Sequence, residues 1–339
     1  MLARLAVSVL ALAACGGGGA GRSDGAPPPG DTGAPRDSAT CAALDAAAAV
    51  SDARGADCTA GGIPGSCIDV ASCRGGRTPT AGACAGAANI ECCTPRFAAD
   101  VTCDPDAAPQ PNACLVEEPG DAGCPAGMAR VDAFCVDRFE AALVDAATGA
   151  PWSPYVDPAG ASVRAVSLRG AVPQGYIAQT AASAACVAAG KALCSDAQWL
   201  RACQGPAATT YPYGATREPG VCNDARAVHP AVELYGTSAS WIFSHLDSPC
   251  LNQEAAGLAR SGAHAGCVTA EGIFDMMGNL HEWTAAAAGT FRGGYYVDTV
   301  ENGPGCLYAT TAHDTAYADY STGFRCCAPM GSVPTSGVR

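Results

Sequence analysis

The stretch FRGGYYVDTVENGPGC, Phe291 to Cys306, belongs to a set of motifs that decide the fold of this chain. Three blocks precede it in the order GKALCSDAQWLRACQGP (190–206), YPYG (211–214) and GIFDMMGNLHEW (272–283), and STGFRCC (321–327) follows it. A single short motif is weak evidence, whereas several motifs in one order and at set spacings form a strong signal. The C-terminal part of the chain is therefore expected to adopt one defined fold.

Together these blocks resemble the formylglycine-generating enzyme family, also called sulfatase-modifying factors, over residues 123–330. The resemblance implies an α+β fold of the C-type-lectin-like kind, rich in loops and stabilised by disulfides and calcium. Active relatives oxidise a sulfatase cysteine to formylglycine with molecular oxygen. That reaction uses a Cu(I) ion held by two thiolates, because soft sulfur ligands select Cu(I).

The two positions that hold copper in active relatives are Asp298 and Gly303 in this chain. Cys306 is the nearest cysteine, but its distance to GFRC matches a family cysteine that forms a structural disulfide. A carboxylate and a bare backbone do not replace a pair of thiolates, so copper is not expected and the inherited oxidation is expected to be lost. Tyr295 in place of the usual serine, and His281 in place of the tryptophan of the GN-x-W-E-W motif, are further departures.

The N-terminus, MLARLAVSVLALAAC, predicts an exported lipoprotein. Arg4 and the apolar run 5–14 form a signal too short to cross a bilayer as a mature helix, and residues 12–15 resemble a bacterial lipobox. Residues 1–15 are thus expected to be a signal peptide with Cys15 as the lipidation site. Gly16 favours the outer membrane, so the protein is expected to be extracytoplasmic and anchored to the membrane by lipid alone. An ordinary cleaved signal is the alternative.

Cysteine usage predicts disulfides. The chain has 21 cysteines, and an even number remains without Cys15, as expected of paired thiols in an oxidising compartment. Zinc is the rival interpretation, but no CxxC is matched by a second CxxC or by HxxxH.

The chain divides by composition into further segments. Residues 16–40 hold Gly, Pro, Ser and Asp with few apolar side chains, which predicts a flexible tether. Residues 41–97 contain seven cysteines and are expected to form a small disulfide-rich module, part of which loosely resembles modules of secreted cell-wall hydrolases. This module is interpreted either as a disulfide-crosslinked spacer without a ligand or as a binding module. Residues 98–122 are interpreted as a linker and 331–339 as a tail.

The charge balance excludes two classes of partner. A formal net charge of −13 and a single lysine, Lys191, argue against nucleic acid and against an anionic membrane surface. Solubility is the preferred interpretation of this acidity.

Local patterns predict several elements within the main unit. Residues 128–139 have the character of short strands, and 180–189 that of a short helix ending at Gly190. Ser195 and Gln198 form a capping box that predicts a helix over 196–204, with one inward face made by Trp199, Leu200 and Cys203. Regular structure is expected to be sparse beyond Gly205.

The resemblance also implies how the fold is held. It pairs Cys186 with Cys326 and Cys203 with Cys306. Adjacent cysteines in an extended segment point to opposite faces, so Cys327 needs another partner, for which Cys194 is the natural candidate. A bond between Cys222 and Cys267 is a weaker expectation.

The family binds structural calcium in the loop that GIFDMMGNLHEW represents. The resemblance implies ligands from the side chains of Asp275 and Glu282 and from the carbonyls of Gly278 and Leu280, and Ca²⁺ prefers such oxygen ligands. A capped loop with two solvated carboxylates is the alternative.

His313 could join Asp298 and His281 around the former substrate groove. A hydrogen-bonded polar lining is the favoured interpretation, and a catalytic carboxylate–histidine pair the other. The leading hypothesis is a lipoprotein whose domain no longer oxidises cysteine and binds a protein or glycan partner at the cell envelope. The alternatives are a copper oxidase with a rearranged thiol pair and a different enzyme centred on Asp298, His281 and His313.

Overall fold

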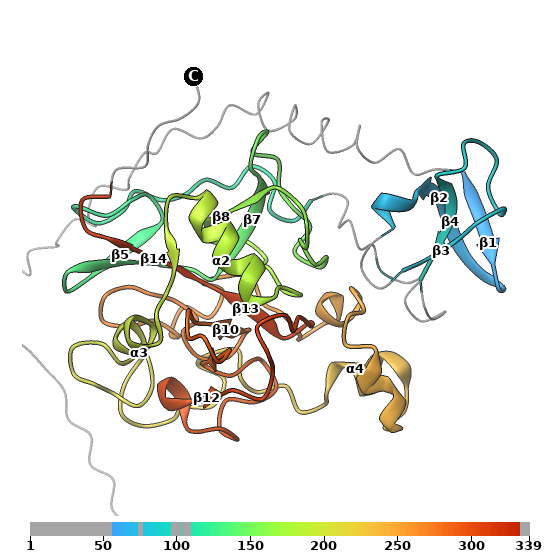
Figure 1. Cartoon of the computed structure of the whole chain (residues 1–339). Helices are drawn as coiled ribbons and strands as arrows, with labels where there is room; N and C mark the ends of the chain where they lie inside the picture. The colour runs from blue at the N-terminus through green and yellow to red at the C-terminus, as the bar shows by residue number, and fades with distance from the viewer. Residues whose placement is uncertain (1–55, 74–76, 96–102, 104–109, 333–339) are drawn as a thin grey trace, which may run out of the picture. The chain divides into compact units, whose positions relative to one another are not determined.

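The computed structural model describes residues 56–73, 77–95, 103 and 110–332, whose path is shown in Figure 1. The predicted signal peptide with Cys15, the tether and most of the tail lie outside these residues. Within the described ranges, no helix has the length and hydropathy that crossing a bilayer requires.

The small cysteine-rich module forms an antiparallel four-stranded sheet in the order β1-β2-β4-β3. Its elements are β1 (Asp57–Ala60), β2 (Ile63–Asp69), a 3-10 turn η1 (Val70–Ser72), β3 (Thr78–Thr80) and β4 (Ile90–Thr94). The disulfides are Cys58–Cys92, Cys67–Cys84 and Cys73–Cys93. Because the sheet buries few large apolar side chains, these crosslinks are expected to supply much of its stability.

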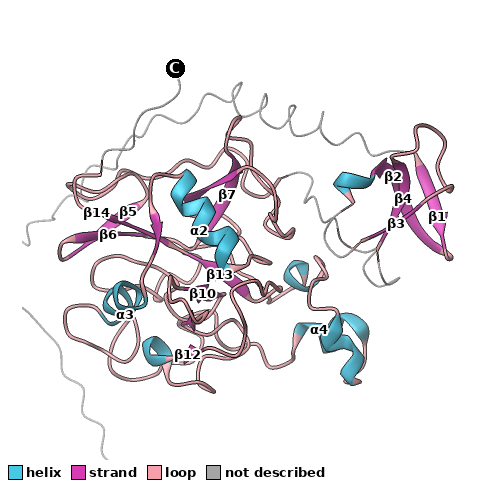
Figure 2. Cartoon of the chain, in the orientation of Figure 1, coloured by secondary structure: helices cyan, strands magenta, loops and turns pink. Residues whose placement is uncertain are grey.

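The main unit is an α+β fold in which loops and turns predominate over helices and strands (Figure 2), as the sequence predicts. Its first sheet has the order β5-β6-β14-β9, formed by β5 (Met128–Val131), β6 (Phe134–Asp137), β14 (Cys326–Pro329) and β9 (Ala192–Leu193). Its second has the order β12-β11-β10-β13, formed by β12 (Ala309–Thr310), β11 (Phe291–Arg292), β10 (His281–Trp283) and β13 (Thr322–Phe324). A hairpin pairs β7 (Ala141–Asp145) with β8 (Val163–Ser167).

Two α-helices match the elements predicted from local signals. Helix α2 spans Gln179–Ala188, and Gly190 beyond it has a φ of +72°. Helix α3 spans Asp196–Gln204 and begins with the predicted capping box, in which Ser195 and Gln198 exchange hydrogen bonds. Trp199 on α3 is fully buried, so its predicted place in the core is confirmed.

A third helix was not expected from the sequence. Helix α4 (Pro230–Tyr235) begins with the Nδ1 atom of His229 accepting the N–H of Ala231 at 3.2 Å and ends at Gly236, whose φ is +62°. Proline in the first turn and glycine after the last are ordinary helix signals, but six residues are too few to show periodicity. The remaining turns are η3 (Ser240–Ser244), η4 (Leu251–Gln253) and η5 (Gly305–Leu307).

The segment interpreted as a linker is attached to the main unit at several points. The side chain of Asn112 is buried, and it accepts the N–H of Val172 at 2.7 Å and donates to the carbonyl of the same residue at 2.8 Å. A disulfide joins Cys103 to Cys250, and Glu117 accepts the N–H of Ser167 at 2.9 Å. Part of the segment interpreted as a linker therefore packs on the main unit, because Asn112 and Glu117 make their hydrogen bonds there.

Four long-range disulfides join the elements of the main unit. They are Cys186–Cys326, Cys194–Cys327, Cys203–Cys306 and Cys222–Cys267, the same pairs that were expected from the sequence. A shorter one, Cys124–Cys135, closes the start of the domain. Cys326 and Cys327 are consecutive in β14, so their side chains leave the strand on opposite faces. Cys326 reaches Cys186 on α2, and Cys327 reaches Cys194, which directly follows β9.

Candidate functional site

The loop that precedes β10 has an unusual backbone. Asp275 and Asn279 have φ of +58° and +59°, a region that non-glycine residues rarely occupy. Gly278 between them has a φ of +76°, and a Cβ there would lie 2.3 Å from the carbonyl oxygen of Asn223. The glycine is thus required both for its conformation and for the close approach of another segment.

Glu282, at the centre of β10, takes part in a fully buried ion pair. Its carboxylate accepts hydrogen bonds from Nε and Nη2 of Arg325 and from Nε1 of Trp199, each at 2.6 Å. Arg325 is fully buried and donates further to the carbonyls of Asp137 and Phe274, each at 2.9 Å. A bidentate, hydrogen-bonded geometry of this kind is what a buried ion pair needs to offset desolvation.

Two more buried carboxylates lie close to this pair. Glu140 accepts the N–H of Leu280 at 3.0 Å and the side-chain amide of Asn279, and Asp275 accepts the N–H of Gly262 at 2.7 Å. Burial raises the pKa of Glu140 well above its ordinary value, and the charges of Asp275 and Glu282 raise it further. Burial is also the main reason that the pKa of Asp275 rises to about 7. We call Glu140, Asp275, Glu282 and Arg325 the charged junction; its carboxylates outnumber its cation.

The expected calcium ligands lie in the charged junction and in the loop beside it. The carbonyl oxygens of Gly278 and Leu280 accept no backbone hydrogen bond from the described residues, and one oxygen of Asp275 is likewise not engaged. The Glu282 carboxylate, in contrast, already accepts from Arg325 and Trp199 with both oxygens. Its Oε1 atom accepts only one of these hydrogen bonds, and the expected role of Glu282 as a side-chain ligand stays a prediction.

The two residues at the positions that hold copper in active relatives, Asp298 and Gly303, serve as parts of a turn. The Oδ1 atom of Asp298 accepts the N–H groups of Val300 and Glu301 at 2.9 and 3.0 Å. Gly303 has a φ of +113°, and a Cβ there would lie 2.9 Å from the carbonyl oxygen of Leu307. Cys306 is bonded to Cys203, and every cysteine that the structure describes is in a disulfide. The described residues thus offer no thiol pair to Cu(I).

His281, Asp298 and His313 are close enough to influence one another. The ring of His281 packs against Phe291, Tyr295 and Tyr308 with centroid distances of 5.2, 4.8 and 5.4 Å. Burial lowers the pKa of His281 to about 3, with Asp298 acting in the opposite direction and His313 in the same one. His313 itself is exposed and stacks on Tyr317 at 3.7 Å.

No hydrogen bond joins any two of these three candidate residues, all of which lie in the described part of the chain. Nδ1 of His281 has no partner although the residue is only 8 % exposed. A base oriented by a carboxylate needs such a bond, so the arrangement gives no support to a catalytic pair.

Several residues of the charged junction and of the surroundings of His281 were not singled out from the sequence. Tyr308 lies against His281, and the electrostatic effect of Asp298 on its hydroxyl shows that these two side chains are neighbours. Glu140 and Arg325 occupy the charged junction. A charged residue inside an otherwise apolar run, as in FEAAL and GFRCC, is the one sequence signal that could have indicated them.

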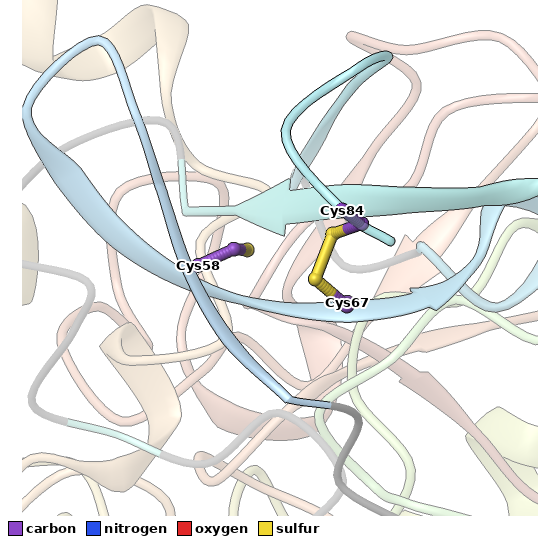
Figure 3. Close-up of side chains that lie close together, drawn as sticks. All are labelled: Cys58, Cys67 and Cys84. Carbon is purple, nitrogen blue, oxygen red and sulfur yellow. A yellow bond between two sulfur atoms is a disulfide. The ribbon is translucent and has the colours of Figure 1, made fainter. Parts of the chain in front are cut away.

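The small module contains a group of three sulfur atoms within 4.8 Å of one another, from Cys58, Cys67 and Cys84 (Figure 3). Cys67 and Cys84 are bonded to each other, and Cys58 is bonded to Cys92. Metal binding requires thiolates, so this group is a pair of neighbouring disulfides and not a zinc site in its oxidised form.

Comparison with known proteins identifies a family. The family model described as sulfatase-modifying factor enzyme 1-like domain matches residues 124–330. No curated protein matches the chain.

Among solved structures, CarF is 20 % identical with a TM-score of 0.27, and the match covers 41 % of this chain and 47 % of that one, so the chain spans about half of CarF. The Major Tropism Determinant I1 variant is 14 % identical with a TM-score of 0.36, covering 62 % and 54 %. PvdO from Pseudomonas aeruginosa is 13 % identical with a TM-score of 0.35, covering 58 % and 80 %. At these TM-scores the likenesses carry no conclusion about function.

Proposed function

Because the chain belongs to the sulfatase-modifying factor enzyme 1-like family, we propose that it keeps the family's fold and has exchanged cysteine oxidation for binding. The protein would be an exported lipoprotein whose domain binds a protein or glycan partner at the cell envelope. One observation carries the proposal: the two copper positions are Asp298 and Gly303, and the nearest cysteine, Cys306, is bonded to Cys203.

Loss of the inherited reaction is tested by copper-dependent oxygen uptake. The purified chain is loaded with Cu(I) and incubated with a CxPxR peptide, while an active family enzyme serves as the assay control. We expect no copper-dependent uptake and no aldehyde on the peptide. Uptake that disappears in the Cys306→Ser variant would show a rearranged copper site and overturn the proposal.

Structural calcium at the charged junction is part of the proposal. The proposed ligands are the side chains of Asp275 and Glu282 and the carbonyls of Gly278 and Leu280, and a cation would offset the excess of buried carboxylates there. We expect CaCl2 to raise the melting temperature of EDTA-treated protein, and the Asp275→Asn variant to lose this response. Asp298→Asn, which removes a carboxylate outside the charged junction, is the matched control. An equal response in the wild type and Asp275→Asn would exclude this site.

Lipid anchoring through Cys15 is likewise a proposal, supported by the lipobox-like residues before it. Metabolic labelling with a fatty acid is expected to mark the wild type and not Cys15→Ser. Fractionation of the envelope then tests the expected outer-membrane location. Labelling of Cys15→Ser equal to the wild type would contradict this proposal.

A further inference from the structure

The hairpin of β7 and β8, which are labelled in Figure 1, has two apolar faces. Side chains alternate along a strand, so Val163 and Ala165 pack into the cluster that contains α2, whereas Val166 packs into a separate small cluster. Arg164 lies two residues before Val166 and therefore shares its face. Val144 is paired with Arg164 across the hairpin and belongs to the same small cluster.

The segment from Asn112 to Glu117 covers this second face of the hairpin. It is fixed at both ends, because Asn112 forms two hydrogen bonds with Val172 and Glu117 accepts the N–H of Ser167. Between these ends Leu115 packs against the small cluster. A pocket of about 100 Å³ remains between the segment and the hairpin. Its apolar walls are Leu115, Val116, Val144, Pro151, Val166 and Leu168.

The pocket contains one charged group that is not engaged. Arg164 is the only basic residue of its lining and is partly buried. Within the described part of the chain, no hydrogen bond or ion pair engages the guanidinium of Arg164. Glu117 is the only acidic residue of the lining, and it already accepts the N–H of Ser167 at 2.9 Å and lies 3.5 Å from the ammonium of Lys191. The unused charge of the pocket is therefore positive.

The size, walls and charge of the pocket restrict what it can hold. Its volume is roughly that of three molecules of liquid water, but apolar walls leave water with few hydrogen-bond partners. A short aliphatic group suits these walls better, because its burial is favourable. The planar fork of N–H donors on a guanidinium matches a carboxylate. A sulfate or phosphate dianion is a poorer match, because Arg164 alone would have to balance two charges beside Glu117.

On these grounds we propose that this pocket binds a carboxylate carried by a short aliphatic group. Arg164 pairs with the carboxylate, and the apolar walls contact the aliphatic part. This chemistry occurs in free short-chain acids and at the C-terminus of a peptide that ends in valine. The inference goes beyond the proposed function, because no residue of the pocket belongs to the charged junction or to the positions that hold copper in active relatives.

Binding is measured on the full chain by NMR titration that follows the ligand signals. The probes are isovalerate, its uncharged counterpart isovaleramide, inorganic sulfate, and the tripeptide glycyl-glycyl-valine with a free carboxylate. We expect isovalerate to bind saturably with a Kd of about 1 mM, and the amide and sulfate to bind at least tenfold more weakly. Binding of the tripeptide would identify a chain terminus as the source of the carboxylate, and its failure to bind would identify a free acid.

Matched variants separate the pocket from the general charge of the chain. Arg164→Gln removes the guanidinium from the pocket, and Arg130→Gln removes one from an exposed position on β5. We expect the first to weaken binding of isovalerate at least tenfold and the second by less than twofold. Val116→Asp adds a negative charge at a half-exposed position of the pocket wall, and Val187→Asp adds one at an exposed position of α2. Only Val116→Asp is expected to weaken binding, at least fivefold.

An unchanged melting temperature shows that a variant has folded. Four outcomes would overturn the inference: no saturable binding of isovalerate, equal binding of isovaleramide, sulfate binding as tight as that of isovalerate, and equal weakening by Arg164→Gln and Arg130→Gln. None of them affects the proposed function, which fails on a different measurement, the copper-dependent uptake of oxygen.

Discussion

Two consecutive residues of β10 face two regions of opposite character. Glu282 is 1 % exposed and lies in the charged junction, where each oxygen of its carboxylate has a donor. His281 points to the other face of the strand, where its ring packs against Tyr295 and its Nδ1 atom has no partner. We call the side of Glu282 the closed region, and we call the side of His281, which leads to the partly exposed turn that begins at Asp298, the open region.

The comparison also separates the residues that match the family's motifs from the residues at which this chain differs. Glu282, Trp199, Arg325 and the long-range disulfides belong to motifs that resemble the family, and in the structure they connect to one another. Asp298 and His281 depart from the family pattern, and they gather on the open side. Of these two, the partly exposed Asp298 can be exchanged at little cost, because surface side chains carry little of the folding free energy.

The largest expected effect is on the closed region. Arg325→Met leaves the carboxylate of Glu282 buried without its partner, so we expect a loss of about 3–5 kcal/mol in the free energy of unfolding, measured by guanidinium denaturation. Adding Glu282→Gln removes the orphaned charge and is expected to recover part of the loss. A change below about 1 kcal/mol for Arg325→Met would mean that the charged junction does not hold the fold.

The disulfide that joins α3 to η5 is expected to matter next. Replacing both Cys203 and Cys306 with serine opens a loop with a sequence separation of 103, and a cost of about 2–4 kcal/mol is expected in the same denaturation experiment. Replacing Cys124 and Cys135, which are separated by 11, should cost less, because a shorter loop restricts the unfolded chain less. Equal costs would indicate that local strain or packing decides, and not chain entropy.

A smaller effect is expected from pH at the start of α4. Burial, and secondarily Arg226, lowers the pKa of His229, so the unfolded chain takes up a proton before the folded one as pH falls. The contribution of His229 to stability is thus complete above about pH 6.5 and declines below it, by less than about 1 kcal/mol for a half-exposed group. His229→Asn keeps a capping acceptor for the N–H of Ala231 without titrating in this range.

The test compares the free energy of unfolding of the wild type and His229→Asn at pH 7.5 and 5.5. We expect the difference between the two proteins to shift in favour of the variant at the lower pH. A constant difference would show that His229 does not sense pH in the fold.

The smallest effect is expected on the open region. Asp298→Asn retains an oxygen that can accept the N–H groups of Val300 and Glu301, so stability should change by no more than about 0.5 kcal/mol. The measurement is again chemical denaturation. A loss comparable to that of Arg325→Met would remove the distinction between the two regions.

Local signals in the sequence predicted the elements that depend on neighbouring residues. The capping box at Ser195 and Gln198 fixes the start of α3, and the glycine at position 190 follows the end of α2. The hairpin of β5 and β6 follows from a short apolar run, with Asp132 at a φ of +48° in its turn. Helix α4 was missed because its signals are those of a turn as well as of a helix.

Contacts between distant segments could not be predicted in the same way. Glu140 reaches Asn279 across 139 positions, and Asn112 reaches Val172 across 60, so no local pattern marks either contact. The segment around Asn112 has the composition of a linker, and its buried amide shows that composition alone does not decide where a polar segment lies.

By itself, the sequence determined that the chain carries the motifs of a known fold family and that neither residue 298 nor residue 303 is a cysteine. Both conclusions depend only on which residue occupies which position. Only the tertiary structure decided that Glu282 is committed to Arg325, that Asp298 closes a turn, and that Nδ1 of His281 is left without a partner. The reason is physical: whether a polar group is free depends on every segment packed around it, and the order of residues along the chain does not specify those neighbours.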